Sequence, residues 1–256
     1  MFDFIAFLLL TSTAQAAGWQ EEQDPVRCSL ARGMPDAIQQ AEIVSLSTDF
    51  PFQNVEIGIL LPAKGIKFKA RGRLDVDLGG SPADRAKLDY ETSKATAGRT
   101  QLNVRLPLAA LGSSAPSAFA LQNENGRQDV SREGLSDKLA WLSNCREKQT
   151  AALGISPVEV DEALTPAIAS QVAWITNGDV PRQRARPITY RGYMIWRIEL
   201  DGAVTNCRFA VTSGEPTLDS RLCELLTKRG RYLKSAINAQ GENMVSWGGR
   251  RMVLSF

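Results

Sequence analysis

The chain has 256 residues, of which 43% are hydrophobic, and its formal net charge is +2 at pH 7. This length holds one large or two small domains, and the apolar content is sufficient for a packed core. The sequence contains 4 cysteines and 0 histidines, which excludes Ser-His and Cys-His nucleophilic catalysis and every metal site built on histidine.

The N-terminus carries a short apolar run, Phe4–Leu10, followed by the small-x-small sequence Ala14-Gln15-Ala16. This run is too short for a membrane-spanning helix, which needs about 20 apolar residues, and no later stretch is long enough. The pattern predicts a signal peptide over residues 1–16, cleaved after Ala16. The charged residue before the run is Asp3 rather than Lys or Arg, so an uncleaved tether or a misassigned start is the alternative.

Residues 17–147 are predicted to form a strand-rich N-terminal domain. Val55–Leu61 is a continuous apolar run typical of a buried strand, and Leu102–Leu106 alternates between apolar and polar residues. Ile66–Leu78 alternates for longer, which predicts a half-buried strand or a hairpin bent near Gly72.

A helix is predicted at the end of this domain, over Ser131–Glu147, because leucines recur there at helical spacing and Cys145 shares their face. Residues 148–175 combine Ala, Ser, Thr and Pro with few charges, which predicts a linker containing one short helix. We identify no family for the N-terminal domain. Asp75 and Asp77 lie two apart on the polar side of a strand, where solvated charges are favoured over paired catalytic carboxylates.

Two strands joined by a tight turn are predicted after the linker. Tyr193–Leu200 and Ala203–Val211 both alternate, and their apolar sides are formed by Met194, Trp196, Ile198 and Leu200, and by Cys207, Phe209 and Val211. Asp201-Gly202 between them is the pair that best supports the positive φ angles of a two-residue hairpin loop.

A short helix and a last strand complete the predicted C-terminal domain. Thr217–Arg229 has leucines at positions i, i+4, i+7 and i+8, which form one apolar stripe, and Gly230 is the predicted C-cap. Met252, Leu254 and Phe256 alternate as a third strand. The predicted fold class is therefore α+β, with a strand-rich N-terminal domain, its terminal helix, and a small ββαβ domain over residues 176–256.

This order of elements, with its motifs, resembles the C-terminal domain of the TonB energy-transducer family over about residues 174–256. The motifs are Trp174-Ile175-Thr176-Asn177-Gly178-Asp179-Val180-Pro181, Asp201-Gly202 with Cys207 five residues on, Ser213-Gly214, Leu218-Asp219, Cys223 and Arg229-Gly230-Arg231-Tyr232. The resemblance implies protein–protein interaction at the cell envelope, with neither enzymatic activity nor a cofactor.

The four cysteines can pair in three ways, and export places them in an oxidising compartment. The resemblance favours Cys207–Cys223, because one subgroup of the family has a disulfide that ties its second strand to its helix. That choice leaves Cys28 with Cys145, a bond between the two ends of the N-terminal domain. A metal site is the competing interpretation, although the cysteines are far apart in sequence and form no CxxC motif.

Proteins of the family bind an extended segment of an outer-membrane receptor as an added strand at a sheet edge. The resemblance predicts such an edge within Asn243–Phe256, comprising Met244, Val245, Arg250, Arg251, Met252, Val253 and Leu254. Gly248-Gly249 interrupts this segment and predicts a bulge or a split strand. Arg250 and Arg251 would either steer an acidic partner or protect the edge from pairing.

The predicted function is thus that of an exported periplasmic protein, linked to outer-membrane receptor transport by strand addition. The alternative is a periplasmic scaffold or envelope-binding module that is unconnected to transport and uses the fold for homodimerisation or wall binding. Residues 176–256 hold 13 Lys and Arg against 7 Asp and Glu, which favours acidic partners, and nucleic acid is not expected. The next candidate surface is formed by Arg182, Arg184 and Arg186. Packing is the favoured role of Trp174, Trp196 and Trp247.

Overall fold

The computed structural model describes residues 18–33, 38, 40–63, 66–77, 85–95, 99–107, 118–131, 135–161, 167–170, 174–179, 189–238 and 240–255. The predicted signal peptide, the arginines at 182, 184 and 186, and Phe256 lie outside these residues. The described part is rich in strands, with a curled nine-stranded sheet and few helices. None of its helices is long and apolar enough to cross a membrane.

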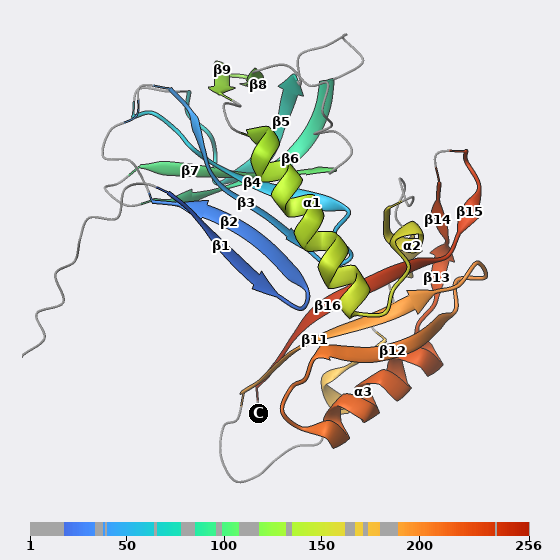
Figure 1. The fold of residues 1–256 in the computed structure, drawn as a ribbon. Helices are drawn as coiled ribbons and strands as arrows, with labels where there is room; N and C mark the ends of the chain where they lie inside the picture. Colours follow the sequence, from blue (N-terminus) through green and yellow to red (C-terminus); the bar gives the residue numbers. More distant parts are fainter. Residues whose placement is uncertain are drawn as a thin grey trace, which may run out of the picture.

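The N-terminal part is built on an antiparallel sheet with the order β1-β2-β3-β4-β7-β6-β5-β8-β9. Its strands are β1 (Trp19–Asp24), β2 (Arg27–Arg32), β3 (Glu42–Asp49), β4 (Asn54–Leu60), β5 (Arg71–Asp77), β6 (Arg85–Lys94), β7 (Thr100–Pro107), β8 (Ala118–Asn123) and β9 (Gly126–Ser131). The sheet curls until Val130 forms a bridge with Ala41, close to the start of β3 (Figure 1). The apolar run of β4 is buried, and the alternate apolar side chains of β7 face the inside, as their sequences predict.

The predicted strand Ile66–Leu78 is shorter in the structure. Only Arg71–Asp77 forms β5, whereas residues 66–69 have no regular structure. Phe68 nevertheless packs edge to face on Tyr90, with ring centroids 5.3 Å apart. Phe68 therefore covers the core without belonging to a strand.

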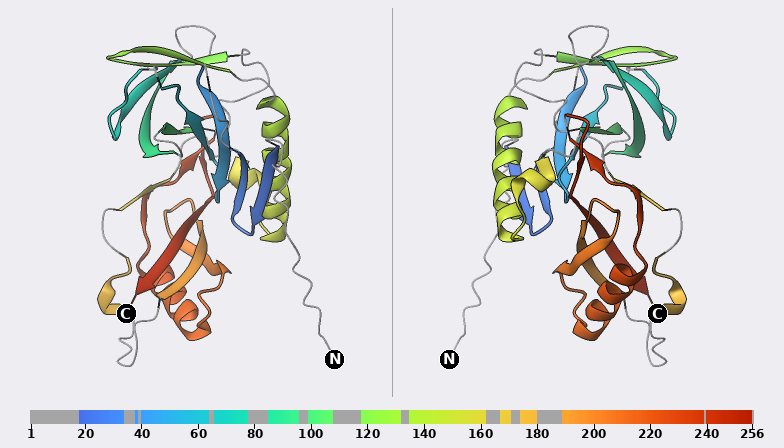
Figure 2. Two further views of the ribbon diagram at one scale, coloured as in Figure 1. Left: turned by 90° about the vertical axis from the view of Figure 1, so that its left-hand side faces the viewer. Right: turned by 90° about the vertical axis from the view of Figure 1, so that its right-hand side faces the viewer.

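The predicted helix is α1 (Leu135–Ala152), which starts four residues later and ends five residues later than its sequence pattern suggests. Gly154, two residues after the end of α1, has a φ of 64°. The Gly154 N–H bonds to the Ala151 carbonyl and the Ile155 N–H to the Thr150 carbonyl, a Schellman motif. In the views of Figure 2, α1 stands beside β1 and β2. The predicted Cys28–Cys145 disulfide is confirmed and ties it to β2.

The C-terminal part contains a three-stranded sheet with the order β12-β11-β16. The elements are β11 (Thr189–Ile198), β12 (Val204–Val211), α3 (Pro216–Arg229) and β16 (Ser246–Ser255), and the shorter ones are β10 (Ile168–Ala169), η4 (Asn177–Asp179), β13 (Tyr232–Lys234), β14 (Ala236–Ile237) and β15 (Asn243–Met244). Helix α3 lies at the end of the molecule far from β8 and β9 (Figure 2). Its Leu218, Leu222 and Leu226 pack against Met194 and Trp196 of β11.

The second predicted disulfide, Cys207–Cys223, is also confirmed and joins β12 to α3. The predicted two-residue hairpin loop differs. The hairpin loop between β11 and β12 has three residues, because Glu199 N–H bonds to Ala203 O and Gly202, with φ 77°, closes a turn back onto Glu199 O. Gly230 is the C-cap of α3, as predicted; it is extended, and its N–H bonds to the Leu226 carbonyl. A Cβ there would lie 2.7 Å from Val204, so close packing explains this glycine.

Residues of the predicted linker 148–175 form the end of α1, a short helix α2 (Pro157–Asp161) and β10, which pairs with β13. Pro157 is the first residue of α2, where a missing N–H costs nothing. The domain boundaries at residues 147 and 175 stay predictions.

Several motif residues of the C-terminal part converge around Tyr232. The ring of Trp174 lies 5.3 Å from that of Tyr232, and Trp196 Nε1 donates to the Tyr232 hydroxyl at 3.1 Å. Arg229 donates to Asp179 Oδ2 at 2.7 Å and to the Trp174 carbonyl at 3.4 Å. These motif residues therefore hold the segment before β11 against the end of α3, which confirms the packing role predicted for Trp174 and Trp196.

Asp179→Asn tests this contact. The Arg229 guanidinium, together with the amide and hydroxyl of Thr176, holds the pKa of Asp179 well below its usual range. A carboxyl whose pKa is depressed in the folded state contributes stability above its unfolded pKa of about 3.9, and loses it as the pH falls further. We expect the Asn variant to melt at a lower temperature than the parent at neutral pH, and the gap to narrow below about pH 4.

Thermal melts followed by circular dichroism across this pH range measure the effect. Asp89→Asn is the matched control, because Asp89 forms a highly exposed cross-strand pair with Arg73 and should change little. A gap for Asp179→Asn that stays constant from neutral to acidic pH would contradict the assigned role.

Candidate partner-binding edge

Strand β16 is an edge of the three-stranded sheet. It pairs with β11 from Thr189–Ser255 to Ile198–Ser246 without a shift in register. Among the described residues, no strand pairs with its other side. An edge strand exposes unpaired N–H and C=O groups to which an extended chain can bind.

The predicted interruption at Gly248-Gly249 is wrong, because β16 runs through both residues in register. A Cβ at Gly248 would lie 2.5 Å from Nε1 of Trp196, and one at Gly249 would lie 2.8 Å from the rings of Phe50 and Tyr193. Aromatic rings thus occupy the space above and below the strand. The glycines permit this approach, and they do not bend the strand.

The opposite edge, β12, is irregular. Its pairing with β11 shifts between Tyr193 and Met194 and again between Ile195 and Arg197. Asn206, which lies in the second irregular stretch, has a φ of 46°. Bulges of this kind make an edge a poor template for another strand. Of the two edges, β16 is therefore the one suited to strand addition.

In the inner half of β16, Ser246–Gly249, Trp247 lies in the core of the N-terminal part, and Gly249 lies against Phe50 of that core. Trp247 packs edge to face on Phe50, with ring centroids 6.4 Å apart. Tyr193 and Ile195 of β11 belong to the same core. Both faces of the C-terminal sheet are therefore covered, one by α3 and the other by the N-terminal part (Figure 1).

The outer half of β16 is open. Arg250 and Arg251 are exposed, and Val253 is 51% exposed, whereas Met252 and Leu254 are half-buried against the core under α3. Five of the seven residues predicted for the partner-binding edge therefore lie on this half-strand. Met244 lies in β15, where it pairs with Ala236, and Val245 separates β15 from β16.

Tyr193 of β11 lies against Gly249, where the inner half of β16 ends. Its hydroxyl donates to the Phe50 carbonyl at 2.7 Å. Burial raises the pKa of this phenol to about 12, with a further contribution from the charge of Asp49, while Arg251 acts in the opposite direction. The phenol therefore stays protonated and keeps donating its hydrogen bond throughout the physiological pH range.

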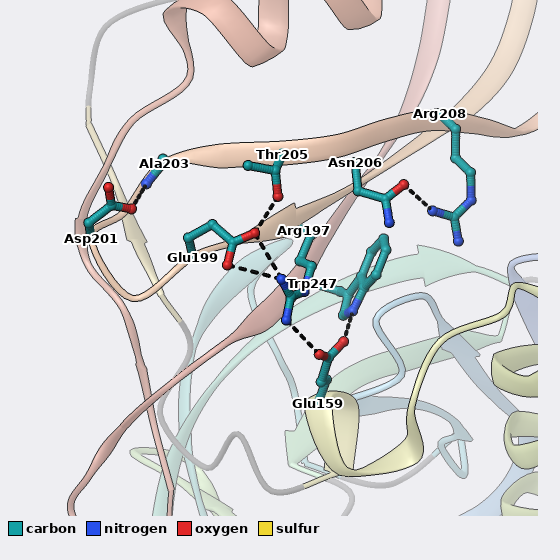
Figure 3. Close-up of polar contacts among 9 residues, drawn as sticks. All are labelled: Glu159, Arg197, Glu199, Asp201, Ala203, Thr205, Asn206, Arg208 and Trp247. Carbon is teal, nitrogen blue, oxygen red and sulfur yellow. Dashed lines mark hydrogen bonds and ion pairs between the residues drawn. The ribbon is translucent and has the colours of Figure 1, made fainter.

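A polar junction beside the inner half is the part of the site that sequence patterns miss. Figure 3 shows Glu159 of α2 accepting from Trp247 Nε1 at 2.6 Å and from Arg197 Nη2 at 2.9 Å. Arg208 lies over the Trp247 ring, 5.0 Å from its centroid, and burial lowers the pKa of its guanidinium. Pro157 indicates the start of a helix in the sequence. No sequence pattern connects Glu159 with Arg197, 38 positions later, or with Trp247, 88 positions later.

A groove with a volume of about 870 Å³ lies on the polar face of the N-terminal sheet, over β4 to β7. Its charges are neutralised by directly opposed cross-strand pairs, Arg71–Glu91, Arg73–Asp89 and Arg105–Glu56. Such pairs are the ordinary composition of a solvated sheet face. Asp77, one of the two aspartates considered above, pairs with Arg127.

The chain matches no protein-family model, and no curated protein or solved structure is significantly similar to it.

Proposed function

We propose that the chain is an exported periplasmic protein that acts by protein–protein interaction. In this proposal the fold is α+β, and the C-terminal part is a ββαβ unit of the TonB C-terminal type. An extended segment of an outer-membrane receptor binds to β16 as an additional strand. The observation that carries this proposal is the regular, unpaired edge of β16, opposite the bulged edge of β12.

The physical basis is β-augmentation, in which main-chain hydrogen bonds give affinity and neighbouring side chains give selectivity. The open half of β16 offers alternate backbone groups to a partner, with Arg250 and Arg251 beside them. Two disulfides support residence in an oxidising compartment. The convergence of the motif residues around Tyr232 supports the resemblance on which the receptor assignment rests.

Proline substitutions in the open half test strand addition. Successive residues of a strand direct their backbone N–H groups to opposite edges. Val253 and Arg250 are three residues apart, so the N–H of one points toward β11 and the N–H of the other points toward the partner. Proline removes that donor and fixes φ. Of Val253→Pro and Arg250→Pro, the outward-facing variant is the one that removes the N–H pointing away from β11. We expect this variant to stay folded and to capture the receptor at least about tenfold more weakly.

The measurement is capture of solubilised outer-membrane receptors by the immobilised full chain, with folding verified by circular dichroism. Val253→Ala and Arg250→Ala are the controls, because both side chains are exposed and the backbone donors stay. The other proline variant, which removes an N–H that bonds to β11, is recognised by its disrupted sheet in circular dichroism. Receptor capture unchanged by a folded, outward-facing proline variant would exclude strand addition at β16.

A periplasmic scaffold unconnected to transport is the second candidate. It is favoured by the burial of one face of the C-terminal sheet against the N-terminal part. A sheet attached in this way cannot extend across a long distance to a receptor. Two copies would then pair along β16. A full chain that sediments as a dimer, dissociates on the outward-facing proline substitution and captures no receptor would favour this candidate.

A further inference from the structure

The segment Leu153–Asp161, which we name the clasp, connects α1 to the C-terminal sheet. It lies within the predicted linker, yet Ile155 and Val160 are buried in the core of the N-terminal part. Arg208 of β12 donates a short hydrogen bond to the Leu153 carbonyl. The clasp therefore belongs to the N-terminal core and also contacts the sheet that carries the binding edge.

Glu159 is the centre of these contacts, because its two oxygens accept from different strands. Oε1 accepts a hydrogen bond from Nη2 of Arg197 in β11, and Oε2 accepts one from Nε1 of Trp247 in β16. The other terminal nitrogen of Arg197 donates to Glu199, which also accepts from Thr205 of β12 (Figure 3). One carboxylate in the clasp is thus connected through side chains to all three strands of the sheet.

The negative charge of Glu159 balances the positive charge of Arg197 at this contact. Arg197 has Glu159 and Glu199 as partners, and these two carboxylates raise the pKa of its guanidinium, Glu159 most strongly. Hydrogen bonds to a charged group are about twice as strong as neutral ones. The neutral amide of glutamine would keep the shape of Glu159 but lose the charge and one of the two acceptor oxygens.

We propose that Glu159 is a positioning residue that locks the C-terminal sheet onto the N-terminal part, so that the edge of β16 is presented from one rigid body. A flexible linker would let the sheet reorient by itself. Here the contacts of the clasp fix its orientation through the inner half of β16. This proposal goes beyond the binding function and holds whether or not β16 takes a partner strand.

The test uses the full chain without a partner. NMR relaxation of backbone amides gives a rotational correlation time for the nine-stranded sheet and another for the β12-β11-β16 sheet. We expect the two times to be equal in the parent. In Glu159→Gln, hydrogen exchange at Ser246–Gly249 should accelerate at least about tenfold, because the opening of this contact becomes easier.

Glu224→Gln is the matched control, because Glu224 pairs with Arg221 on its own helix. The exchange rates of this variant should match those of the parent. If Glu159→Gln does not fold, Trp247→Phe keeps a ring in the core while removing the N–H donor, and should accelerate exchange at the same residues. Unequal correlation times in the parent would overturn the proposal. Exchange in both Glu159→Gln and Trp247→Phe that is indistinguishable from Glu224→Gln would also overturn it.

Discussion

Replacing Trp247 by alanine is expected to lower the free energy of unfolding by about 3–5 kcal/mol, the usual cost of removing a buried tryptophan. The side chain is only 5% exposed, although it belongs to a sheet edge. It fills the space between Phe50 and Arg208, and its N–H satisfies Glu159. The substitution therefore leaves a cavity between the two parts of the chain and removes a partly buried hydrogen bond to Glu159.

Urea unfolding followed by circular dichroism measures this loss. Leu233→Ala is the control, because Leu233 is 70% exposed and should change stability by no more than about 0.5 kcal/mol. Because Trp247 lies in the core of the N-terminal sheet, we also expect one cooperative transition in the parent. A cost below about 1 kcal/mol for Trp247→Ala would mean that the two parts scarcely stabilise each other.

The second large effect is expected from the disulfides. Removing Cys28–Cys145 with a double alanine substitution should cost about 2–5 kcal/mol. Both cysteines are buried, and the bond joins residues 117 positions apart, whereas Cys207–Cys223 spans 16. In the chain-entropy model, the cost of closing a loop rises from about 3 kcal/mol for 15 residues to about 4.7 for 100.

We therefore expect the Cys28→Ala/Cys145→Ala variant to be less stable than the Cys207→Ala/Cys223→Ala variant. The two are compared by urea unfolding under non-reducing conditions. The reverse order would show that the strand-to-helix bond acts on the folded state, through the packing of α3, rather than on the unfolded chain.

The C-terminal elements could be predicted because they carry local signals. The leucines of α3 mark its buried stripe, and the alternation of Met194 with Trp196 marks one face of β11. The opposite face was predicted as polar and is buried, as Tyr193 and Ile195 show. Alternation compares a residue only with its neighbours in the chain. It gives no sign of a second layer contributed by residues more than a hundred positions earlier.

The remaining errors have the same origin. The composition of residues 148–175 is that of a linker, but Glu159 acquires its role from Arg197 and Trp247, which no local pattern connects to it. Gly248-Gly249 suggests a break, although the reason for these glycines is the proximity of Trp196 and Tyr193. The family resemblance predicted a sheet edge at the end of the chain, and β16 is such an edge among the described residues. Its division into a buried and an open half depends on tertiary contacts alone.

The difference between β12 and β16 also limits how this sheet can aggregate. Fibres grow when each added molecule leaves a fresh edge for the next one, which requires two edges that accept strands. Here the bulges of β12 block one side, so pairing through β16 uses the one regular edge that this sheet has within the described residues. Self-association through this sheet therefore terminates at two copies, and the exposed edge is kept without the risk of open-ended polymerisation.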